Sequence, residues 1–464
     1  MAAAISCFLL LNFLSLKGVF FMNTPIYDFM QRYIDGGSVR AHMPGHKGRA
    51  PDGCGFGSAF PYDITEIEGA DVLFESCGII AESEKNASKL FGTAATFFSA
   101  GGSTLCIQAM LAAVCKSGGT FICARNAHRS ATNASVLLDL TPLWLYPEYE
   151  DGSVISGNIT AAAVEKAILK YEGEKPQCVF ITSPDYLGRL APVKEIAEVC
   201  HRYGLPLLVD NAHGAYLAFL EDNKHPIANG ADMCCDSAHK TLPVLTGGAY
   251  LHAGNGKYVP ELKRCMALFG STSPSYLIMA SLDLCNRYLS GSFRADLAET
   301  VKRTEELKKR FEFMTVKDTE PLKVTFYAYI CGLRGQALAG QLRRSGVETE
   351  YADETHTVLM FSTSNTEEDF ARTEAAAEML MCPRILLRPP EFELTEPKRK
   401  LSPREAFFSE KEEISIDDAL GRTAAENVTV CPPCIPIAAA GEVIDENIIK
   451  ILKIYSISKI NVVK

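Results

Sequence analysis

From about residue 79 onward, two kinds of hydrophobic pattern alternate along the chain. Segments such as 104–119 repeat apolar residues at helical spacing, whereas 120–124, 178–181 and 205–209 are short and continuously apolar. Helical spacing predicts helices with one packed face, and short continuous runs predict strands that helices cover on both sides. The alternation therefore predicts an α/β fold built around a mostly parallel sheet.

Glycine, proline and hydroxyl residues mark the ends of the predicted helices. Gly92 follows a helix expected over 81–91, and Gly204 follows a helix expected over 192–203. The second helix is expected to begin with Pro192. Ser402 precedes Pro403 near the C-terminus, which is the order of a helix cap and a first helical residue. These signals predict where individual helices begin and end.

The pattern predicts a large α/β domain followed by two smaller α+β domains. The chain has 464 residues, which is long for a single hydrophobic core. A linker rich in proline and charge lies near 388–403. The expected segments are an apolar extension at 1–21, an arm at 22–75, the large domain at 76–290, a small domain at 291–390 and a tail domain at 400–464.

The apolar extension is interpreted as upstream of the working start at Met22. Its run is interrupted by Lys17 and is too short to span a bilayer, so we expect no stable membrane association. A membrane anchor is the alternative.

Charge and cysteine usage narrow the class of protein. The net charge of −10 leaves no basic stripe for nucleic acid. Most of the 16 cysteines lie in apolar runs, where a free thiol behaves as a small hydrophobe, so we expect the reducing cytoplasm. Cys431 and Cys434 form a C-x-x-C without a second ligand pair, and we expect no metal site.

Four polar groups follow predicted strands, at the sheet edge where α/β proteins bind ligands. They are the small residues 101–104 at a helix start, His128 in "RNAHRS", Asp210 after a buried run, and Lys240, which we expect at the very end of a strand, in "DSAHK". Taken singly, each has an ordinary structural explanation, such as a helix cap, a loop histidine or a turn carboxylate.

Together the four groups describe a site for pyridoxal phosphate. A helix N-terminus with hydroxyl groups suits a phosphate. A lysine forms a Schiff base with an aldehyde, and a carboxylate keeps a pyridine nitrogen protonated. The carboxylate Asp210 precedes the lysine Lys240, which matches the order expected for such a site.

The motifs that carry these groups resemble one enzyme family. They include "AHMPGHKG", "SAGGST", "NAHRS", "VDNAHGAY", "DSAHKTLPVLTGGAYLH" and "SPREAFF", and with the other matching pieces they cover most of 23–442. The chain is similar to the ornithine/lysine/arginine decarboxylases, in their short form without an N-terminal wing domain. The resemblance implies a fold-type-I pyridoxal phosphate enzyme, with a large domain like that of aspartate aminotransferase.

The resemblance also implies roles for individual residues. Lys240 would carry the Schiff base, Asp210 would pair with the pyridine nitrogen and His128 would stack on the ring. The remaining cofactor-binding residues would be Gly102, Ser103, Thr104, Ala212, His213, Ser237 and His239. The second His-Lys pair, His46 and Lys47, is assigned no chemical step, and a role in substrate binding or dimerisation is the alternative.

The implied reaction is α-decarboxylation of a basic amino acid, with arginine favoured over lysine and ornithine, in polyamine synthesis. Transamination or aldol cleavage on the same fold, and a non-catalytic dimer that binds the cofactor, are the alternatives. The resemblance implies a homodimer or larger assembly with the site at the subunit interface, where Ser271–Tyr276 would approach the partner's phosphate. Glu350, Asp353 and Glu426 are candidates for binding the distal cation, and Cys434 replaces the family's usual glycine.

Overall fold

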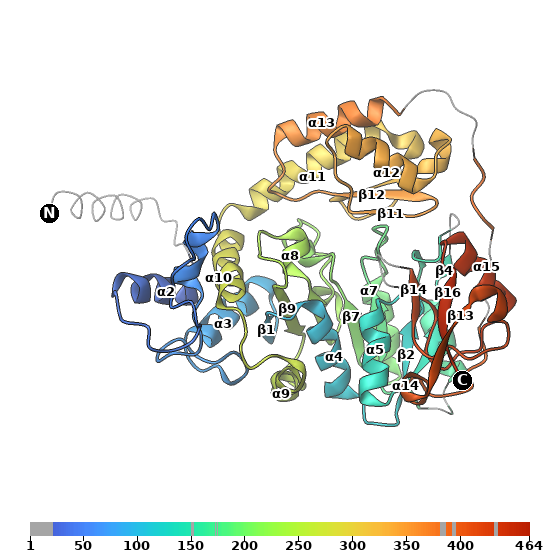
Figure 1. The fold of residues 1–464 in the computed structure, drawn as a ribbon, viewed down its shortest axis with the longest axis horizontal. Helices are drawn as coiled ribbons and strands as arrows, with labels where there is room; N and C mark the ends of the chain where they lie inside the picture. Colours follow the sequence, from blue (N-terminus) through green and yellow to red (C-terminus); the bar gives the residue numbers. More distant parts are fainter. Residues whose placement is uncertain are drawn as a thin grey trace.

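The computed structural model describes residues 22–149, 153–171, 173, 175–380, 387–391, 396–430 and 435–464. The extension at 1–21 and the pair Cys431 and Cys434 lie outside these residues. Figure 1 shows a central domain with the N-terminal arm on one side, the tail on the other and a small domain above. Within the described ranges, no helix is long and apolar enough to cross a membrane.

The central domain is built on one seven-stranded sheet with the order β1-β9-β8-β7-β6-β2-β3. Neighbours from β8 to β3 run parallel, whereas β9 is antiparallel to both β8 and β1. The prediction of a mostly parallel sheet is confirmed. The strands are β1 (Ala95–Ser99), β2 (Thr120–Ala124), β3 (Thr141–Leu145), β6 (Val179–Thr182), β7 (Leu207–Asp210), β8 (Met233–Asp236) and β9 (Ala249–Ala253).

Both faces of the sheet are apolar because helices cover both. Phe121 and Cys123 of β2 face a core formed with α4 (Gly102–Val114), α5 (Arg129–Leu138) and α9 (Val259–Phe269). Ile122 and Ala124 face the opposite core, with α6 (Ala161–Lys170) and α7 (Val193–Arg202). Since successive side chains point to opposite faces, a strand buried twice must be apolar throughout.

Helix boundaries agree with the terminal signals to within a few residues. Helix α3 (Ile79–Phe91) ends at Gly92, whose φ of 66° is left-handed. In α14 (Pro403–Phe408), Ser402 caps the helix and forms a capping box with Glu405. Two boundaries were predicted wrongly. Pro192 caps α7 instead of opening it, and α4 stops at Val114, five residues before the end of the helical pattern at 104–119.

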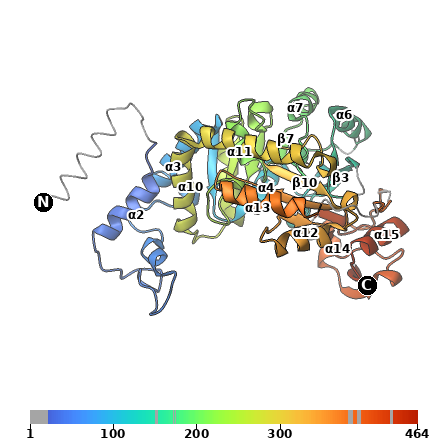
Figure 2. The same ribbon diagram turned by 90° about the horizontal axis from the view of Figure 1, so that it is seen from above.

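The small domain packs helices against one face of a three-stranded sheet, β10-β12-β11. It lies above the carboxyl ends of the central strands, as Figures 1 and 2 show. Its elements are α11 (Phe293–Arg310), β10 (Lys323–Tyr327), α12 (Gly335–Arg344), β11 (Tyr351–Ala352), β12 (His356–Met360) and α13 (Glu367–Glu378).

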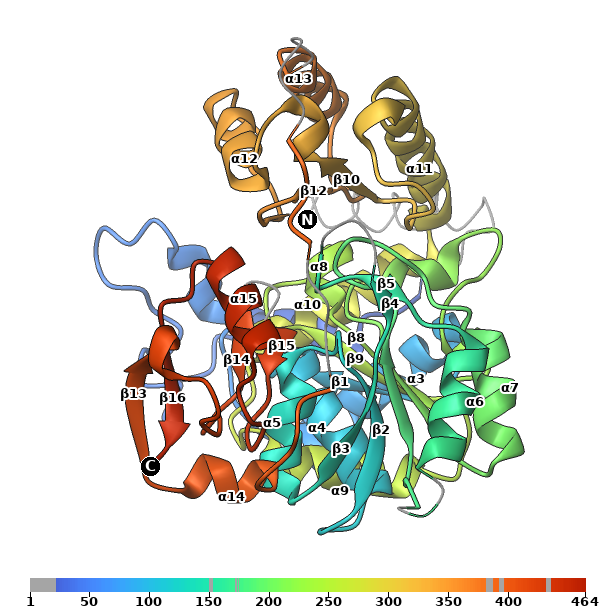
Figure 3. The ribbon, with the colours of Figure 1, turned by 90° about the vertical axis from the view of Figure 1, so that its right-hand side faces the viewer.

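The tail contains two strand pairs and packs beside α5, β2 and β3 (Figure 3). Its elements after α14 are β13 (Lys411–Ser415), β14 (Val428–Val430), β15 (Ile435–Ala438), α15 (Glu446–Ile454) and β16 (Lys459–Val463). At the other end of the chain, the arm begins with α2 (Pro25–Asp35), which packs against α3 and α10 (Tyr276–Ser290). A short hairpin, β4 (Glu148–Tyr149) and β5 (Gly157–Asn158), follows β3.

Candidate active site

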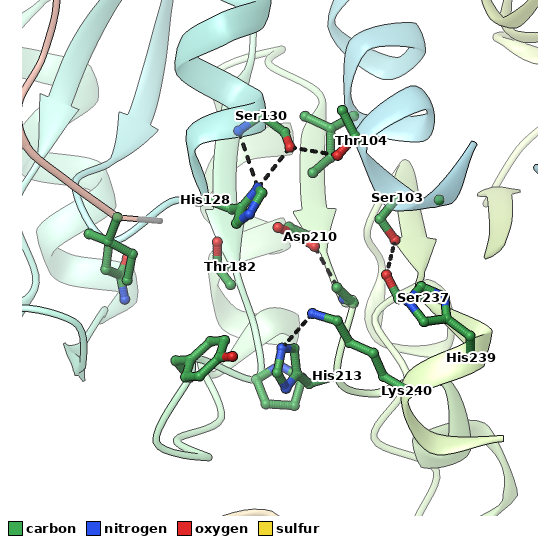
Figure 4. Close-up of a pocket in the computed structure, with 17 residues that line it drawn as sticks. Ser103, Thr104, His128, Ser130, Thr182, Asp210, His213, Ser237, His239 and Lys240 are labelled. Carbon is green, nitrogen blue, oxygen red and sulfur yellow. Dashed lines mark hydrogen bonds between the residues drawn. The ribbon is translucent and has the colours of Figure 1, made fainter. Parts of the chain in front are cut away.

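A cavity of about 220 Å³ opens at the carboxyl ends of β2, β6, β7 and β8, beside the start of α4. This is the sheet edge at which open α/β folds bind ligands. All ten residues predicted for the site line it, and Figure 4 shows His128, Asp210 and Lys240 converging on the same space. The ten are Gly102, Ser103, Thr104, His128, Asp210, Ala212, His213, Ser237, His239 and Lys240. Their contacts with a cofactor stay predictions.

The first turn of α4 forms an anion cradle on one side of the cavity. Gly102 has a φ of 66°, and a Cβ built there would meet no atom within 4 Å, so the backbone is open to a ligand. Ser103 Oγ and Ser237 Oγ share a hydrogen bond of 2.7 Å, which brings two hydroxyls from different elements together. Backbone N–H groups at a helix start, joined by such hydroxyls, bind phosphate well.

Asp210 ends β7 at the floor of the cavity with 3% of its surface exposed. Ala212 N donates to its Oδ1 at 3.1 Å. Burial raises the pKa of Asp210, and the Lys240 ammonium opposes that rise. Asp210 is the one carboxylate among the described residues that line the cavity, so it is placed to hold a positive ring nitrogen.

His128 caps α5 and presents its ring to the cavity. Its Nδ1 accepts a hydrogen bond from Ser130 N at 3.2 Å and contacts Ser130 Oγ at 2.7 Å, which fixes the ring plane. Ser130 Oγ is also hydrogen-bonded to Thr104 Oγ1 at 3.0 Å. Burial is the main cause that lowers the pKa of His128 to about 4, and the positive charge of Lys240 lowers it further. The ring is therefore neutral at pH 7.

Lys240 lies on α8 (Ala238–Thr241), a single helical turn after β8. The expectation that the lysine ends a strand was wrong, because the chain leaves the sheet at Asp236 and Lys240 N donates to Ser237 O. Lys240 Nζ lies 2.8 Å from His213 Nε2. Burial, followed by Lys240, holds the pKa of His213 well below its usual range, so the lysine meets a neutral imidazole.

Behind the lysine, a buried charge network holds the strand ends together. Asp236 Oδ2 lies 3.1 Å from both His225 Nε2 and His252 Nε2, and Asp236 Oδ1 accepts from Asn211 Nδ2 at 2.7 Å. His225, Cys234 and Asp236 have the ligand types of a metal site, but the carboxylate is already paired with both imidazoles. The network ties the end of β7 to that of β8, and so fixes Asp210 relative to the turn that carries Lys240.

Sequence reasoning missed several residues that line the cavity. Asn126 and Thr182 lie at strand ends, so the rule that located Asp210 would have found them. Tyr186 and Ile435 carry no comparable signal, since Tyr186 lies inside the loop after β6 and Ile435 comes from the distant tail. The lining is completed by Ile107, Ser130 and Pro184.

Other predicted groups lie away from the cavity. His46 Nε2 pairs with Asp63 at 3.0 Å on the arm, and neither His46 nor Lys47 lines the cavity. Ser275 caps α10 through Ile278 N, and the Tyr276 hydroxyl donates to Asp71 O at 2.7 Å. Within one chain, residues 271–276 therefore contribute nothing to the cavity wall.

The polar lining fits pyridoxal phosphate. Several buried side-chain atoms in the described part of the chain lack a hydrogen-bond partner, and three of them belong to the cavity lining: Asn126 Oδ1, Thr182 Oγ1 and His213 Nδ1. Buried polar atoms are nearly always partnered in native proteins, so three of them around one cavity indicate a polar ligand. The cradle at α4, the carboxylate of Asp210 and the amine of Lys240 match a phosphate, a pyridine nitrogen and an aldehyde.

Comparisons with known proteins agree with this chemistry. Residues 24–330 match the Orn/Lys/Arg decarboxylase major domain, and residues 391–459 match the C-terminal domain. The uncharacterized protein YaaO of Bacillus subtilis (strain 168) is 31% identical, over 94% of this chain and 95% of the relative. The arginine decarboxylase of the same organism is also 31% identical, over 93% of each chain.

Solved structures show the same fold. The lysine decarboxylase LdcF of Francisella novicida superimposes with a TM-score of 0.81 at 16% identity, covering 95% of this chain and 81% of that one. The constitutive lysine decarboxylase of E. coli gives 0.78 at 17% identity, covering 95% and 82%. The chain therefore belongs to the Orn/Lys/Arg decarboxylase family and is a pyridoxal phosphate-dependent amino acid decarboxylase.

Proposed function

We propose that this protein decarboxylates arginine at Cα, releasing CO2 and the corresponding amine for polyamine synthesis. The observation that carries the proposal is the meeting of Lys240 and Asp210 in one buried cavity. Transamination is less well supported, because sites for that reaction often clamp the α-carboxylate with arginine. The described residues that line this cavity include no arginine.

Lys240 and His213 would handle the amine and the proton. With the proton of His213 on Nδ1, its Nε2 accepts a hydrogen bond from Lys240 Nζ, which orients the amine toward the cavity. Lys240 would hold the cofactor by the cofactor's aldehyde carbon until the amine of the substrate replaces the amine of the lysine. After CO2 leaves, Lys240 or a histidine returns a proton to Cα, which completes the exchange of the carboxylate for hydrogen.

Asp210 and His128 would set the electronics of the site. Bound pyridoxal phosphate supplies a positively charged ring that accepts the electron pair left by the departing carboxylate. Asp210 would keep the ring nitrogen protonated, because a buried carboxylate favours a charged partner. His128, held by Ser130, would stack against the ring as a neutral imidazole.

The choice of arginine is supported by the names of relatives, and the structure offers Glu350 as a group for its distal cation. Tyr186 lines the cavity, and its hydroxyl donates to Glu350 Oε1 at 3.0 Å. Asp353, in contrast, is buried and caps a turn through Thr355 N and His356 N. Glu426 is paired with Lys411 in the tail. We therefore propose Glu350 as the group that meets the distal guanidinium.

Replacing Glu350 with glutamine should weaken arginine binding. A hydrogen bond to a charged group contributes about 1.5–3 kcal/mol, so kcat/KM should fall by about 10- to 100-fold, mostly through KM. The measurement is kcat and KM with arginine, lysine and ornithine, and the unmodified protein should favour arginine. Glu426→Gln is the matched control and should leave both constants unchanged. Equal KM values for the Glu350 variant and the unmodified protein would remove Glu350 from the proposal.

We also propose that the protein works as a homodimer or larger assembly. The arm exposes apolar side chains, including Val39 at 92%, Met43 at 67% and Phe56 at 69%, and it projects from the body (Figure 2). Clustered exposed apolar residues favour a protein interface. Sedimentation equilibrium should give at least twice the chain mass of 50.6 kDa. A mass of one chain at working concentration would contradict this.

A further inference from the structure

One buried ion pair joins the tail to the large domain beside the cavity. Arg125 directly follows β2 and Glu442 lies in the tail, and they are only 2% and 1% exposed. Arg125 Nη1 donates to Glu442 Oε1 at 2.7 Å, and Nη2 donates to Oε2 at 2.8 Å. This bidentate geometry sets both the distance and the relative orientation of the two groups.

Further hydrogen bonds tie each partner to its surroundings. Glu442 Oε1 also accepts from Trp144 Nε1 at 2.6 Å, and Oε2 accepts from Ala439 N at 2.7 Å. The Arg125 guanidinium lies 4.4 Å from the centre of the Trp144 ring. Burial alone would lower the pKa of Arg125, but the Glu442 carboxylate raises it above its ordinary value. The Arg125 guanidinium is therefore charged, and a buried charge that loses its partner is strongly destabilising.

The pair also holds two walls of the cavity. Arg125 directly precedes Asn126 and is three residues before His128, and both of these line the cavity. Its Nη2 donates to Ile437 O at 2.8 Å, within the strand β15 that begins at Ile435. Ile435 is the tail residue in the cavity lining. The segment that follows β2 thus carries a guanidinium that contacts the tail strand directly.

A second contact of the tail lies far from the cavity and provides a comparison. Arg404 of α14 donates to Val136 O and Leu137 O, both at 3.1 Å, at the C-terminal end of α5. This contact docks the tail but touches no residue of the cavity lining. Docking of the tail and positioning of the cavity walls can therefore be disturbed separately.

We propose that the Arg125–Glu442 pair positions the active site, by holding Asn126 and His128 on one wall and Ile435 on another at fixed separation. Arg125 and Glu442 are positioning residues, and neither touches the substrate. The inference rests on the proposed function, since it assigns the tail a part in setting the rate of decarboxylation. The tail is then a structural wall of the catalytic site in the same chain.

Arg125→Lys keeps the charge and removes the bidentate contact, so it tests the proposal with the cofactor-loaded protein. Because a shift of about 1 Å in an active-site group can cost about 100-fold in rate, kcat should fall by about 10- to 100-fold with KM little changed. The visible circular dichroism of the bound cofactor should change. Hydrogen exchange should be faster in peptides covering 122–130 and 435–442. Glu442→Gln preserves the shape of the side chain and should reproduce these effects. It serves as the test variant if Arg125→Lys fails to fold.

Arg404→Ala is the control, and its kcat and circular dichroism should match those of the unmodified protein. The proposal is overturned if Arg125→Lys keeps its kcat and circular dichroism, or if Arg404→Ala lowers kcat equally. Absence of CO2 release by the unmodified protein would instead contradict the proposed function. Circular dichroism and hydrogen exchange would still test the pair in that case.

Discussion

Replacing Lys240 with alanine should lower the rate of CO2 release by a factor on the order of 10³ or more, because the variant lacks the amine that holds the cofactor and returns a proton. Lys240 Nζ is oriented by His213 at 2.8 Å, and the cavity lining contains no second lysine among the described residues. The measurement is kcat at saturating cofactor. It is paired with borohydride reduction and mass spectrometry to find the residue that carries the cofactor.

Lys257→Ala is the matched control for this change. Lys257 is exposed beyond the end of β9 and does not line the cavity, so its variant should keep full activity. Borohydride should attach the cofactor to the peptide containing Lys240 in the unmodified protein and in the control. More than a tenth of normal activity in Lys240→Ala, or cofactor attached elsewhere, would contradict the assignment.

Replacing Asp210 with asparagine should have the second largest effect. The variant keeps the shape of the side chain and an oxygen that accepts from Ala212 N. It loses the negative charge of a residue that is only 3% exposed. Removing one preorganised electrostatic partner from such a site costs about 10²- to 10³-fold in kcat. The expected result is that loss in kcat at saturating cofactor, with the protein still folded and able to bind cofactor.

Asp232 provides the control for Asp210. It lies just before β8, at the opposite edge of the same sheet, where it pairs with His201 at 2.9 Å. Asp232→Asn should change stability more than kcat. If Asp210→Asn retained normal kcat, Asp210 would have no part in holding the ring nitrogen.

The location of the cavity could be predicted because of a rule about parallel sheets. The carboxyl ends of parallel strands meet at one edge, so Asp210 after one apolar run and His128 after another had to lie near each other. The antiparallel direction of β9 could not be predicted in the same way. Its residues are buried on both faces, and a strand covered on both sides reads as a continuous apolar run in either direction.

Tertiary contacts explain what the sequence did not reveal. Tyr186 reaches the cavity from the loop after β6, and its neighbour Glu350 comes from the small domain. Ile435 arrives with the tail, held by the Arg125–Glu442 pair across more than half of the chain. No local pattern marks a residue whose role depends on a distant segment packing against it.

The most direct test of decarboxylation is the fate of carbon in arginine labelled at its carboxyl group, with the purified protein and pyridoxal phosphate. The account predicts one labelled CO2 for each arginine consumed, together with one equivalent of the unlabelled amine. Label retained in a keto acid, with no CO2 released, would contradict it.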